Sequence, residues 1–189
     1  MIEKVTIPEG VSGYWKITRF TVTEEQAQIT ALRAMVTGGR ERPVSAGTYS
    51  KLTHNGAIVM SDTPAEMDDH RPFVRRAHGN VLITGLGLGM VVGAVAAKPA
   101  VEHVTVIEAS PDVVHLVADH YRSSRVTIHL ADAFDWVPPA GAHYNAVWHD
   151  IWPDMCTTNL RQMTRLKRKY GRFADWQGCW GEEHTRRHR

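Results

Sequence analysis

Cysteine is scarce in this sequence, with only Cys156 and Cys179 among 189 residues. Two cysteines are too few for the disulfide framework of a small secreted protein, so we expect free thiols in a reducing compartment. No apolar run approaches the roughly 20 residues that a membrane-spanning helix needs. The N-terminal residues MIEKVTIPEG also lack the long apolar segment of a secretion signal. These absences predict a cytoplasmic protein without a membrane-spanning segment.

Charge is unevenly distributed, although the formal net charge of the chain is only +2. Residues 81–160 hold 3 Lys/Arg against 8 Asp/Glu, whereas residues 161–189 hold 9 against 3. A basic tail of this kind either contacts a phosphate backbone or keeps a helix solvated. Trp152, Trp176 and Trp180 could stack on bases, but we favour packing of the tail tryptophans on the edge of a sheet. Nucleic acid is therefore a possible partner that the sequence does not favour.

The C-terminal region also contains residues of the types that bind zinc: Cys156, Cys179, His184 and His188. Their spacing does not fit a compact zinc knuckle. The sequence therefore predicts no metal site.

The N-terminal region begins with a strand pattern and then a helix pattern. Residues 15–23, WKITRFTVT, alternate polar and apolar side chains as a half-buried strand does. Thr23 and Gln26 form the pattern of a capping box, which predicts the start of a helix. This helix, EEQAQITALRAMV, is expected to end at Gly38-Gly39.

A hairpin and a second helix are expected next. TYSKLTH and AIVMSD flank Asn55-Gly56, which is a strong signal for a β-hairpin. Thr63-Pro64 starts a helix that ends near Gly79, with proline in its first turn. Residues 1–79 are therefore predicted to form a small β-rich lid with two helices.

From Asn80 onward, short apolar runs alternate with helical patterns. Such runs indicate strands buried on both faces, and the alternation indicates a parallel sheet with helices on both sides. The expected strands are NVLIT, VEHVTVIEA, RVTIHL and YNAVWHD, and the expected helices are MVVGAVAAK, DVVHLVADHY and TTNLRQMTRLKRKY. The tail after Gly171 shows no clear period. Residues 80–189 therefore predict a Rossmann-like α/β domain with a basic C-terminal tail.

Three alternating glycines follow the first of these strands, in VLITGLGLGM. A ligand at the end of a parallel strand lies against a helix N-terminus, where glycine permits both a positive φ and a close backbone approach. A GxGxG pattern alone also fits a tight turn without a ligand. Acidic residues follow the other three strands: Glu108, Asp132 and Asp150. Because the carboxyl ends of parallel strands share one edge, we expect the glycine turn and these carboxylates to surround one crevice.

The motifs at these strand ends resemble those of a known family. VLITGLGLG, VIEAS, LADAF and YNAVWHD are similar, in order and spacing, to the motifs of class I S-adenosylmethionine-dependent methyltransferases. The preceding NGAIVMSDTPAEMDDH resembles the spermidine synthase branch, in which a β-rich N-terminal domain precedes the same core. The resemblance covers roughly residues 48–154. It implies a methyltransferase that binds S-adenosylmethionine and modifies a small-molecule or other, unidentified acceptor.

The resemblance also implies roles for individual residues. The glycine turn lies behind the methionine part of the cofactor, Glu108 holds the ribose, and Asp132 with Ala133 holds the adenine. Asp150 matches an aspartate near the reacting centre, where a catalytic carboxylate orients or deprotonates an amine or hydroxyl. The residues implied to bind the cofactor are Gly85, Leu86, Gly87, Gly89, Glu108, Ala109, Asp132 and Ala133.

Several positions depart from the family's patterns. Leu88 replaces the aspartate with which aminopropyltransferases hold the cofactor amine, and Ile83 stands where many methyltransferases have an acidic residue. DIWPD separates Asp150 from Asp154, whereas the family has paired aspartates there. The alternatives to a methyltransferase are therefore an aminopropyltransferase of polyamine synthesis and a non-catalytic nucleoside-binding or interaction module. A plain NAD-binding domain is less favoured, because Met90 stands where GxGxxG requires Gly or Ala.

The expected parallel sheet is short, because only 39 residues follow Asp150. The family's full sheet would continue with three more strands, so we expect a sheet truncated at its C-terminal side. An uncovered edge strand promotes aggregation. We therefore expect the tail, the lid or a second subunit in a homodimer to cover this edge.

Two histidines lie near the expected site. His149 precedes Asp150 on the same strand, so the two side chains point to opposite faces, and we expect a structural role for His149. His70 could approach the crevice from the lid, but we expect it to be exposed on its helix.

Overall fold

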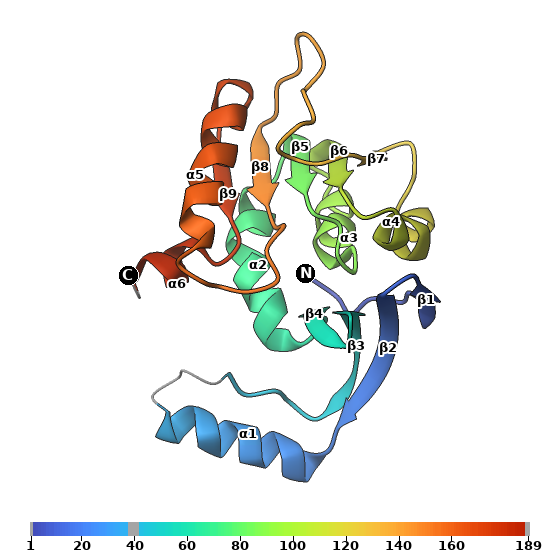
Figure 1. Cartoon of the computed structure of the whole chain (residues 1–189), viewed down its shortest axis with the longest axis vertical. Coiled ribbons are helices and arrows are strands. Elements are labelled where there is room, and N and C mark those ends of the chain that lie inside the picture. Colours follow the sequence, from blue (N-terminus) through green and yellow to red (C-terminus); the bar gives the residue numbers. More distant parts are fainter. Residues whose placement is uncertain (1, 38–41, 188–189) are drawn as a thin grey trace.

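The computed structural model describes residues 2–37 and 42–187 and contains two β-sheets with helices packed around them (Figure 1). The N-terminal part of the chain forms a four-stranded antiparallel sheet, and the remainder forms a five-stranded parallel sheet. The expected helix stop at Gly38-Gly39 lies outside the described residues. Within residues 2–37 and 42–187, none of the helices combines the length and apolar character required to span a bilayer.

The antiparallel sheet has the strand order β1-β2-β3-β4. Its strands are β1 (Gly10–Ser12), β2 (Trp15–Val22), β3 (Gly47–His54) and β4 (Ala57–Ser61). The β3–β4 hairpin turns at Asn55 and Gly56, whose φ angles are 51° and 80°. Positive φ at both positions is what a two-residue type I′ turn requires, so the expected hairpin is confirmed.

Helix α1 (Glu24–Val36) follows β2 and starts with the expected capping box. The backbone N–H of Gln26 donates to Thr23 Oγ1 at 3.2 Å, and the backbone N–H of Thr23 donates to Gln26 Oε1 at 2.9 Å. None of the residues of α1 is buried. Its start is therefore fixed by local hydrogen bonds and not by core packing.

Helix α2 (Pro64–Arg76) joins the two sheets and has the expected proline in its first turn. One side of the helix is buried, including Met67, Phe73 and Val74. The ring of Phe73 stacks on Trp148 of the parallel sheet with 5.1 Å between the centroids. This contact fixes α2 against the strand that leads to Asp150.

The parallel sheet has the strand order β7-β6-β5-β8-β9. Its strands are β5 (Gly79–Thr84), β6 (Val101–Glu108), β7 (Val126–Leu130), β8 (Ala146–His149) and β9 (Gln177–Cys179). The helices that follow α2 are α3 (Met90–Ala96), α4 (Pro111–Val117), α5 (Asn159–Tyr170) and α6 (Glu182–Arg187), with 3₁₀ turns η1 (Ala118–His120) and η2 (Gly171–Phe173). The carboxyl ends of β5 and β8 point toward the antiparallel sheet (Figure 1). The order of the strands reverses between β5 and β8, the position where open α/β sheets bind ligands.

Side chains of β5 alternate between two cores, one on each face of the sheet. Val81 and Ile83 pack with residues of α2, α3 and α4, whereas Leu82 packs with the buried side of α5. Helices therefore cover both faces, as the continuous apolar run of this strand predicts.

The tail after Gly171, whose sequence shows no clear period, contains β9 and α6. β9 pairs in parallel with β8, with Gln177 opposite Val147. The preceding Trp176 stacks on Trp148 at a centroid distance of 6.3 Å, which is the packing role that we favour for the tail tryptophans. The tail of the same chain therefore covers the edge of β8, which is one of the three possibilities expected for it.

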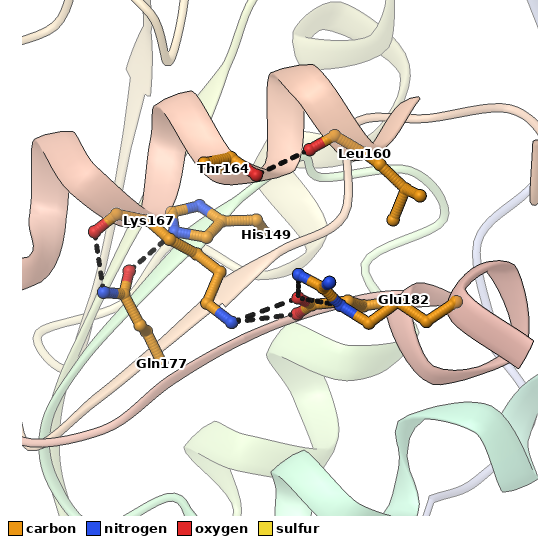
Figure 2. Close-up of polar contacts among 7 residues, drawn as sticks. His149, Leu160, Thr164, Lys167, Gln177 and Glu182 are labelled. Atoms are coloured by element: carbon orange, nitrogen blue, oxygen red, sulfur yellow. Dashed lines mark hydrogen bonds and ion pairs between the residues drawn. The ribbon is translucent and has the colours of Figure 1, made fainter. Parts of the chain in front are cut away.

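Figure 2 shows how side chains fix this tail to α5. Gln177 donates from Nε2 to the carbonyl oxygen of Lys167 at 2.8 Å. Lys167 Nζ in turn donates to Glu182 Oε2 at 3.0 Å, and Arg186 contacts the same carboxylate at 2.8 Å. Both β9 and α6 are thus held by contacts between residues distant in the sequence, which explains why no local pattern indicates them.

Candidate functional site

A cavity of about 370 Å³ lies between the carboxyl ends of the parallel strands and the antiparallel sheet. Its volume is within the range of about 300–1,000 Å³ that is typical of small-molecule sites. The expected crevice is present, because residues at or within two positions of the ends of four strands line the cavity: Gly85, Glu108, Asp132 and Asp150.

The glycine turn forms the floor of the cavity at the end of β5. Gly85 has a φ of 97°, and a Cβ atom there would collide with the backbone carbonyl oxygen of Asp150. Gly87 has a φ of 52°, and a Cβ atom there would lie 2.5 Å from the sulfur of Met60. Glycine is required at these two positions because both residues have a positive φ, and because the Asp150 backbone approaches Gly85 and the Met60 side chain approaches Gly87 closely. Leu86 and Gly89 belong to the same turn but do not line the cavity.

Glu108 lies where β6 meets the glycine turn, and backbone N–H groups hold its carboxylate. Leu86 N donates to Oε2 and Ser110 N to Oε1, each at 2.8 Å. Burial raises the pKa of Glu108, while these backbone hydrogen bonds act to lower it. The carboxylate therefore joins the glycine turn to the start of α4 and lines the cavity together with Ala109.

Asp132 and Ala133 line the cavity after β7, at the position that the sequence predicts. Asp132 Oδ1 accepts from the backbone N–H of Phe134 at 2.7 Å, which closes a tight turn. Tyr170 of α5 donates its hydroxyl to the carbonyl oxygen of Ala133 at 2.7 Å. The turn also brings the ring of Phe134 into the cavity wall, a contact that the sequence reasoning missed although the ring follows the LADA motif directly.

Asp150 follows β8 and lies beside His70 of α2, with 3.7 Å between His70 Nε2 and Asp150 Oδ2. The expectation that His70 is exposed is wrong, because its side chain is only 1% exposed and lines the cavity. Burial, with a smaller effect of Arg42, lowers the pKa of His70 to about 4. Burial and then the carboxylates of Glu66, Asp69 and Glu108 raise the pKa of Asp150 to about 8.

Near pH 7 both members of this pair are therefore uncharged: Asp150 carries a proton and His70 does not. The distance of 3.7 Å is longer than a hydrogen bond, so the two side chains lie next to each other without a direct hydrogen bond. His70 Nδ1 is a buried atom without a hydrogen-bond partner among the described residues. The pair places two groups with strongly shifted pKa values in one cavity, which is typical of functional sites.

His149 points away from the cavity, toward α5 and the tail (Figure 2). Its Nδ1 lies 3.0 Å from Thr84 Oγ1, and its Nε2 lies 3.4 Å from Gln177 Oε1. Burial lowers the pKa of His149 to about 4. The neutral imidazole thus joins β5, β8 and β9, which supports the structural role expected for it.

The antiparallel sheet supplies side chains to the cavity that the sequence reasoning missed. Trp15 of β2 and His54 of β3 are paired residues of neighbouring strands, and their rings stack with 4.5 Å between the centroids. Met60 of β4 reaches the glycine turn, where its sulfur accepts from the backbone N–H of Leu88 at 3.1 Å. Trp152 and Trp180 complete the aromatic part of the lining. No local pattern marks these residues, because their roles depend on how the two sheets pack together.

The residues of metal-binding types named in the sequence analysis do not form a cluster in the described part of the chain. Across residues 2–37 and 42–187, no group of three His, Cys, Asp or Glu side chains is placed to hold a metal ion. Cys179 is buried and His184 is exposed, while His188 lies outside the described residues.

No protein-family model and no curated protein matches the chain. Solved structures do match, among them the N-methyltransferase NodS from Bradyrhizobium japonicum WM9 in complex with S-adenosyl-L-homocysteine, with 16% identity and a TM-score of 0.48. That match covers 60% of this chain and 58% of NodS. A putative type II methyltransferase from Anaeromyxobacter dehalogenans matches with 21% identity and a TM-score of 0.39, covering 55% of this chain and 40% of that protein. The chain thus spans less than two thirds of these proteins.

A third match is the plantazolicin methyltransferase BpumL, in complex with a monoazolic desmethylPZN analog and S-adenosylhomocysteine. Its identity is 13% and its TM-score 0.41, with 57% of this chain and 39% of BpumL covered.

Proposed function

We propose that this chain is an S-adenosylmethionine-dependent methyltransferase. The observation that carries the proposal is the convergence of the glycine turn, Glu108, Asp132 and Asp150 around one cavity at the reversal point of a parallel sheet. When bound, S-adenosylmethionine supplies a methyl group activated by a sulfonium cation. The proposal assigns the ribose to Glu108, the adenine to Asp132, Ala133 and Phe134, and the methionine part to the glycine turn.

The cavity suits this cofactor in its volume and its lining. The acidic residues Glu66, Glu108, Asp132 and Asp150 line it, and neither Lys nor Arg is among its lining residues in the described chain. A cation that enters is therefore attracted and meets no competing side-chain cation. Phe134 and Ile107 belong to one apolar cluster and line the cavity, and the aromatic ring of Phe134 offers a surface on which an adenine ring can stack.

We assign the acceptor to the other end of the cavity, near Asp150, and propose that it is an amine. Glu66 acts electrostatically on Asp150, Trp152 follows Asp150 by two residues, and the backbone N–H of Trp180 donates to the carbonyl oxygen of His149 at 2.8 Å. This part of the lining is therefore acidic and aromatic, a combination that favours a cationic molecule. A bound cation lowers the pKa of Asp150 and frees its carboxylate. Asp150 then takes a proton from the acceptor ammonium, and the nitrogen lone pair that this exposes accepts the methyl group.

A relationship to spermidine synthases is part of this proposal. It is supported by the antiparallel N-terminal sheet, which contributes Trp15, His54 and Met60 to the cavity. Aminopropyl transfer is less well supported, because the side chain of Leu88 is fully buried and provides no carboxylate for the cofactor amine. Methyl transfer to an amine therefore stays the preferred reaction.

Isothermal titration of the purified protein with four ligands tests the cofactor. We expect micromolar binding of S-adenosylmethionine and S-adenosylhomocysteine, and weaker binding of decarboxylated S-adenosylmethionine and NAD. Preference for the decarboxylated form would favour aminopropyl transfer instead. If none of the four ligands binds, the proposal is contradicted, and the remaining alternative is that the chain is a non-catalytic interaction module.

Variants at the proposed ribose and adenine sites test the assignment of residues. Glu108→Ala should abolish binding, whereas the same change at Glu102, exposed at the opposite end of β6, should not alter it. Because Glu108 also holds backbone N–H groups, thermal unfolding must show that the variant is folded. Phe134→Ala provides a second test, since it removes the stacking surface and leaves the backbone hydrogen bond from Phe134 N to Asp132 in place. Unchanged affinity in both variants would refute the assignment.

Turnover is tested with a panel of amines, phenols and carboxylic acids, with the methylated product detected by mass spectrometry. We expect product only from amines, and Asp150→Asn should abolish it while S-adenosylhomocysteine still binds. Methylation of phenols alone would contradict the assignment of the acceptor without affecting that of the cofactor.

A further inference from the structure

Helix α1 is a regular 13-residue helix of which no residue is buried. It lies at one end of the molecule, on the far side of the antiparallel sheet from the parallel sheet (Figure 1). A helix on the surface of a globular protein normally buries an apolar stripe against the core. A helix of this length is only marginally stable in water without such packing. Within residues 2–37 and 42–187, core packing therefore does not account for the stability of α1.

Small side chains face the rest of the chain, and large apolar ones face solvent. Ala27, Thr30 and Ala34 are half-buried, and Thr30 Oγ1 accepts from the backbone N–H of Val44 at 3.2 Å. The large apolar residues of the helix are exposed instead: Ile29 to 44%, Leu32 to 63%, Met35 to 80% and Val36 to 80%. Ile29, Leu32 and Val36 follow the i, i+3, i+7 spacing of one helix face. Clustered apolar exposure of this kind marks an interaction surface.

We propose that this face of α1 binds α1 of a second copy of the same chain, with the two helices antiparallel about a two-fold axis near Ile29. In such a pair the apolar face of each helix covers that of the other. The contact is isologous, so one patch serves both subunits.

The charges on α1 specify the antiparallel arrangement. Glu25, Ile29 and Arg33 are four residues apart and form one row along the helix. Centring the pair on Ile29 places Glu25 opposite Arg33 of the second copy, and Arg33 opposite its Glu25. Neither residue makes an ion pair within the part of the chain that the structure describes. A parallel pair would instead place like charges side by side.

The arrangement is compatible with an accessible cavity. β2 has 8 residues, with Trp15 at the cavity and Val22 next to α1, so about 23 Å separates the two ends of the strand. Two subunits joined through α1 thus keep their cavities distant from the interface. The dimer is independent of the proposed function, and its variants should leave cofactor binding unchanged.

The mass of the full chain, measured by light scattering and sedimentation over micromolar concentrations, tests the dimer. A pair of single helices forms a small interface, so we expect a concentration-dependent monomer–dimer equilibrium. Leu32→Glu should give a monomer at every concentration. Val137→Glu is the matched control, because Val137 is 67% exposed in a loop far from α1 in the sequence, and it should dimerise like the wild type. Circular dichroism confirms that both variants are folded.

Charge reversal tests the antiparallel register. Glu25→Arg and Arg33→Glu should each weaken dimerisation by at least about tenfold, because two attractive pairs become two repulsive ones. The double variant should restore dimerisation, since each pair is then reversed as a whole. A wild type that stays monomeric, a Leu32→Glu variant that dimerises like the control, or a double variant that is not restored would overturn the proposal. Binding of a monomeric wild type to lipid vesicles through α1 would also overturn it.

Discussion

Asparagine in place of Asp150 keeps the size of the side chain but removes its ionisation. Burial and nearby carboxylates raise the pKa of Asp150 from 3.8 to about 8 in the folded protein. The folded chain therefore holds one proton more than the unfolded chain between these two pH values. The stability that Asp150 contributes is complete below its unfolded pKa and is lost as the pH rises through the folded pKa. The Asp150→Asn variant should not show this loss.

The size of the effect follows from the pKa shift. One pKa unit corresponds to about 1.4 kcal/mol, so the shift sets an upper limit of roughly 6 kcal/mol on the stability lost across the range. The Asp150 side chain is 14% exposed at the cavity, and solvent there weakens the effect. We therefore expect the stability advantage of the variant to grow by about 2 kcal/mol between pH 5 and pH 8.5. For a chain of this size, this corresponds to a rise in relative Tm of roughly 4–8 °C.

Thermal unfolding without added ligand, followed by circular dichroism from pH 5 to pH 9, measures this difference. Titrating groups that do not interact with Asp150, such as His149, affect the wild type and the variant equally. The difference between the two curves therefore isolates Asp150 together with the carboxylates coupled to it, Glu66, Asp69 and Glu108. Asp119→Asn is the matched control, because its side chain is 87% exposed, and its curve should follow the wild type. Parallel curves for the wild type and Asp150→Asn would refute the reasoning, since they would show a carboxylate that is ionised throughout.

Three further substitutions test the packing around the site by urea denaturation. Gly85→Ala should lower the free energy of unfolding by more than Gly56→Ala does. Both residues have a positive φ, which alone costs about 1–2 kcal/mol for alanine, but only at position 85 does the added Cβ collide with backbone atoms. Equal effects would contradict the requirement for glycine at position 85. Trp176→Ala should cost about 2 kcal/mol, because it removes a half-buried ring stacked on the sheet, and a negligible effect would mean that the tail is not docked. Tyr170→Phe should cost about 1 kcal/mol by removing a buried hydroxyl that donates at 2.7 Å, and no loss would contradict this hydrogen bond.

The sequence predicts most of the architecture because its elements carry local signals. The continuous apolar runs of β5 and β8 indicate strands buried on both faces, and both strands pair in parallel at the centre of the sheet. The four strand ends could also be placed together, since parallel strands that alternate with helices have their carboxyl ends at one edge. Glu108, Asp132 and Asp150 therefore meet as predicted, without any knowledge of side-chain contacts.

Features that depend on contacts between distant segments could not be predicted in this way. β9 consists of only 3 residues, Gln177 to Cys179, and forms because β8 offers an unpaired edge. Its glycine leaves no periodicity to detect. Trp15 and Met60 reach the cavity only because the antiparallel sheet packs over the strand ends. Such residues become visible once the relative position of the two sheets is known.

His70 is a different case. Its spacing from the apolar residues of α2 indicates a buried position, although histidine as a residue type suggests an exposed one. Met67, His70 and Val74 lie on one face of α2 at i, i+3 and i+7, and all three are buried. A histidine on this face loses hydration, which disfavours the charged form and lowers its pKa to about 4. At neutral pH it therefore adds no positive charge beside Asp150. A cation that enters the cavity meets the carboxylates without competition from an imidazolium, so the burial of His70 supports the preference for cations that we propose.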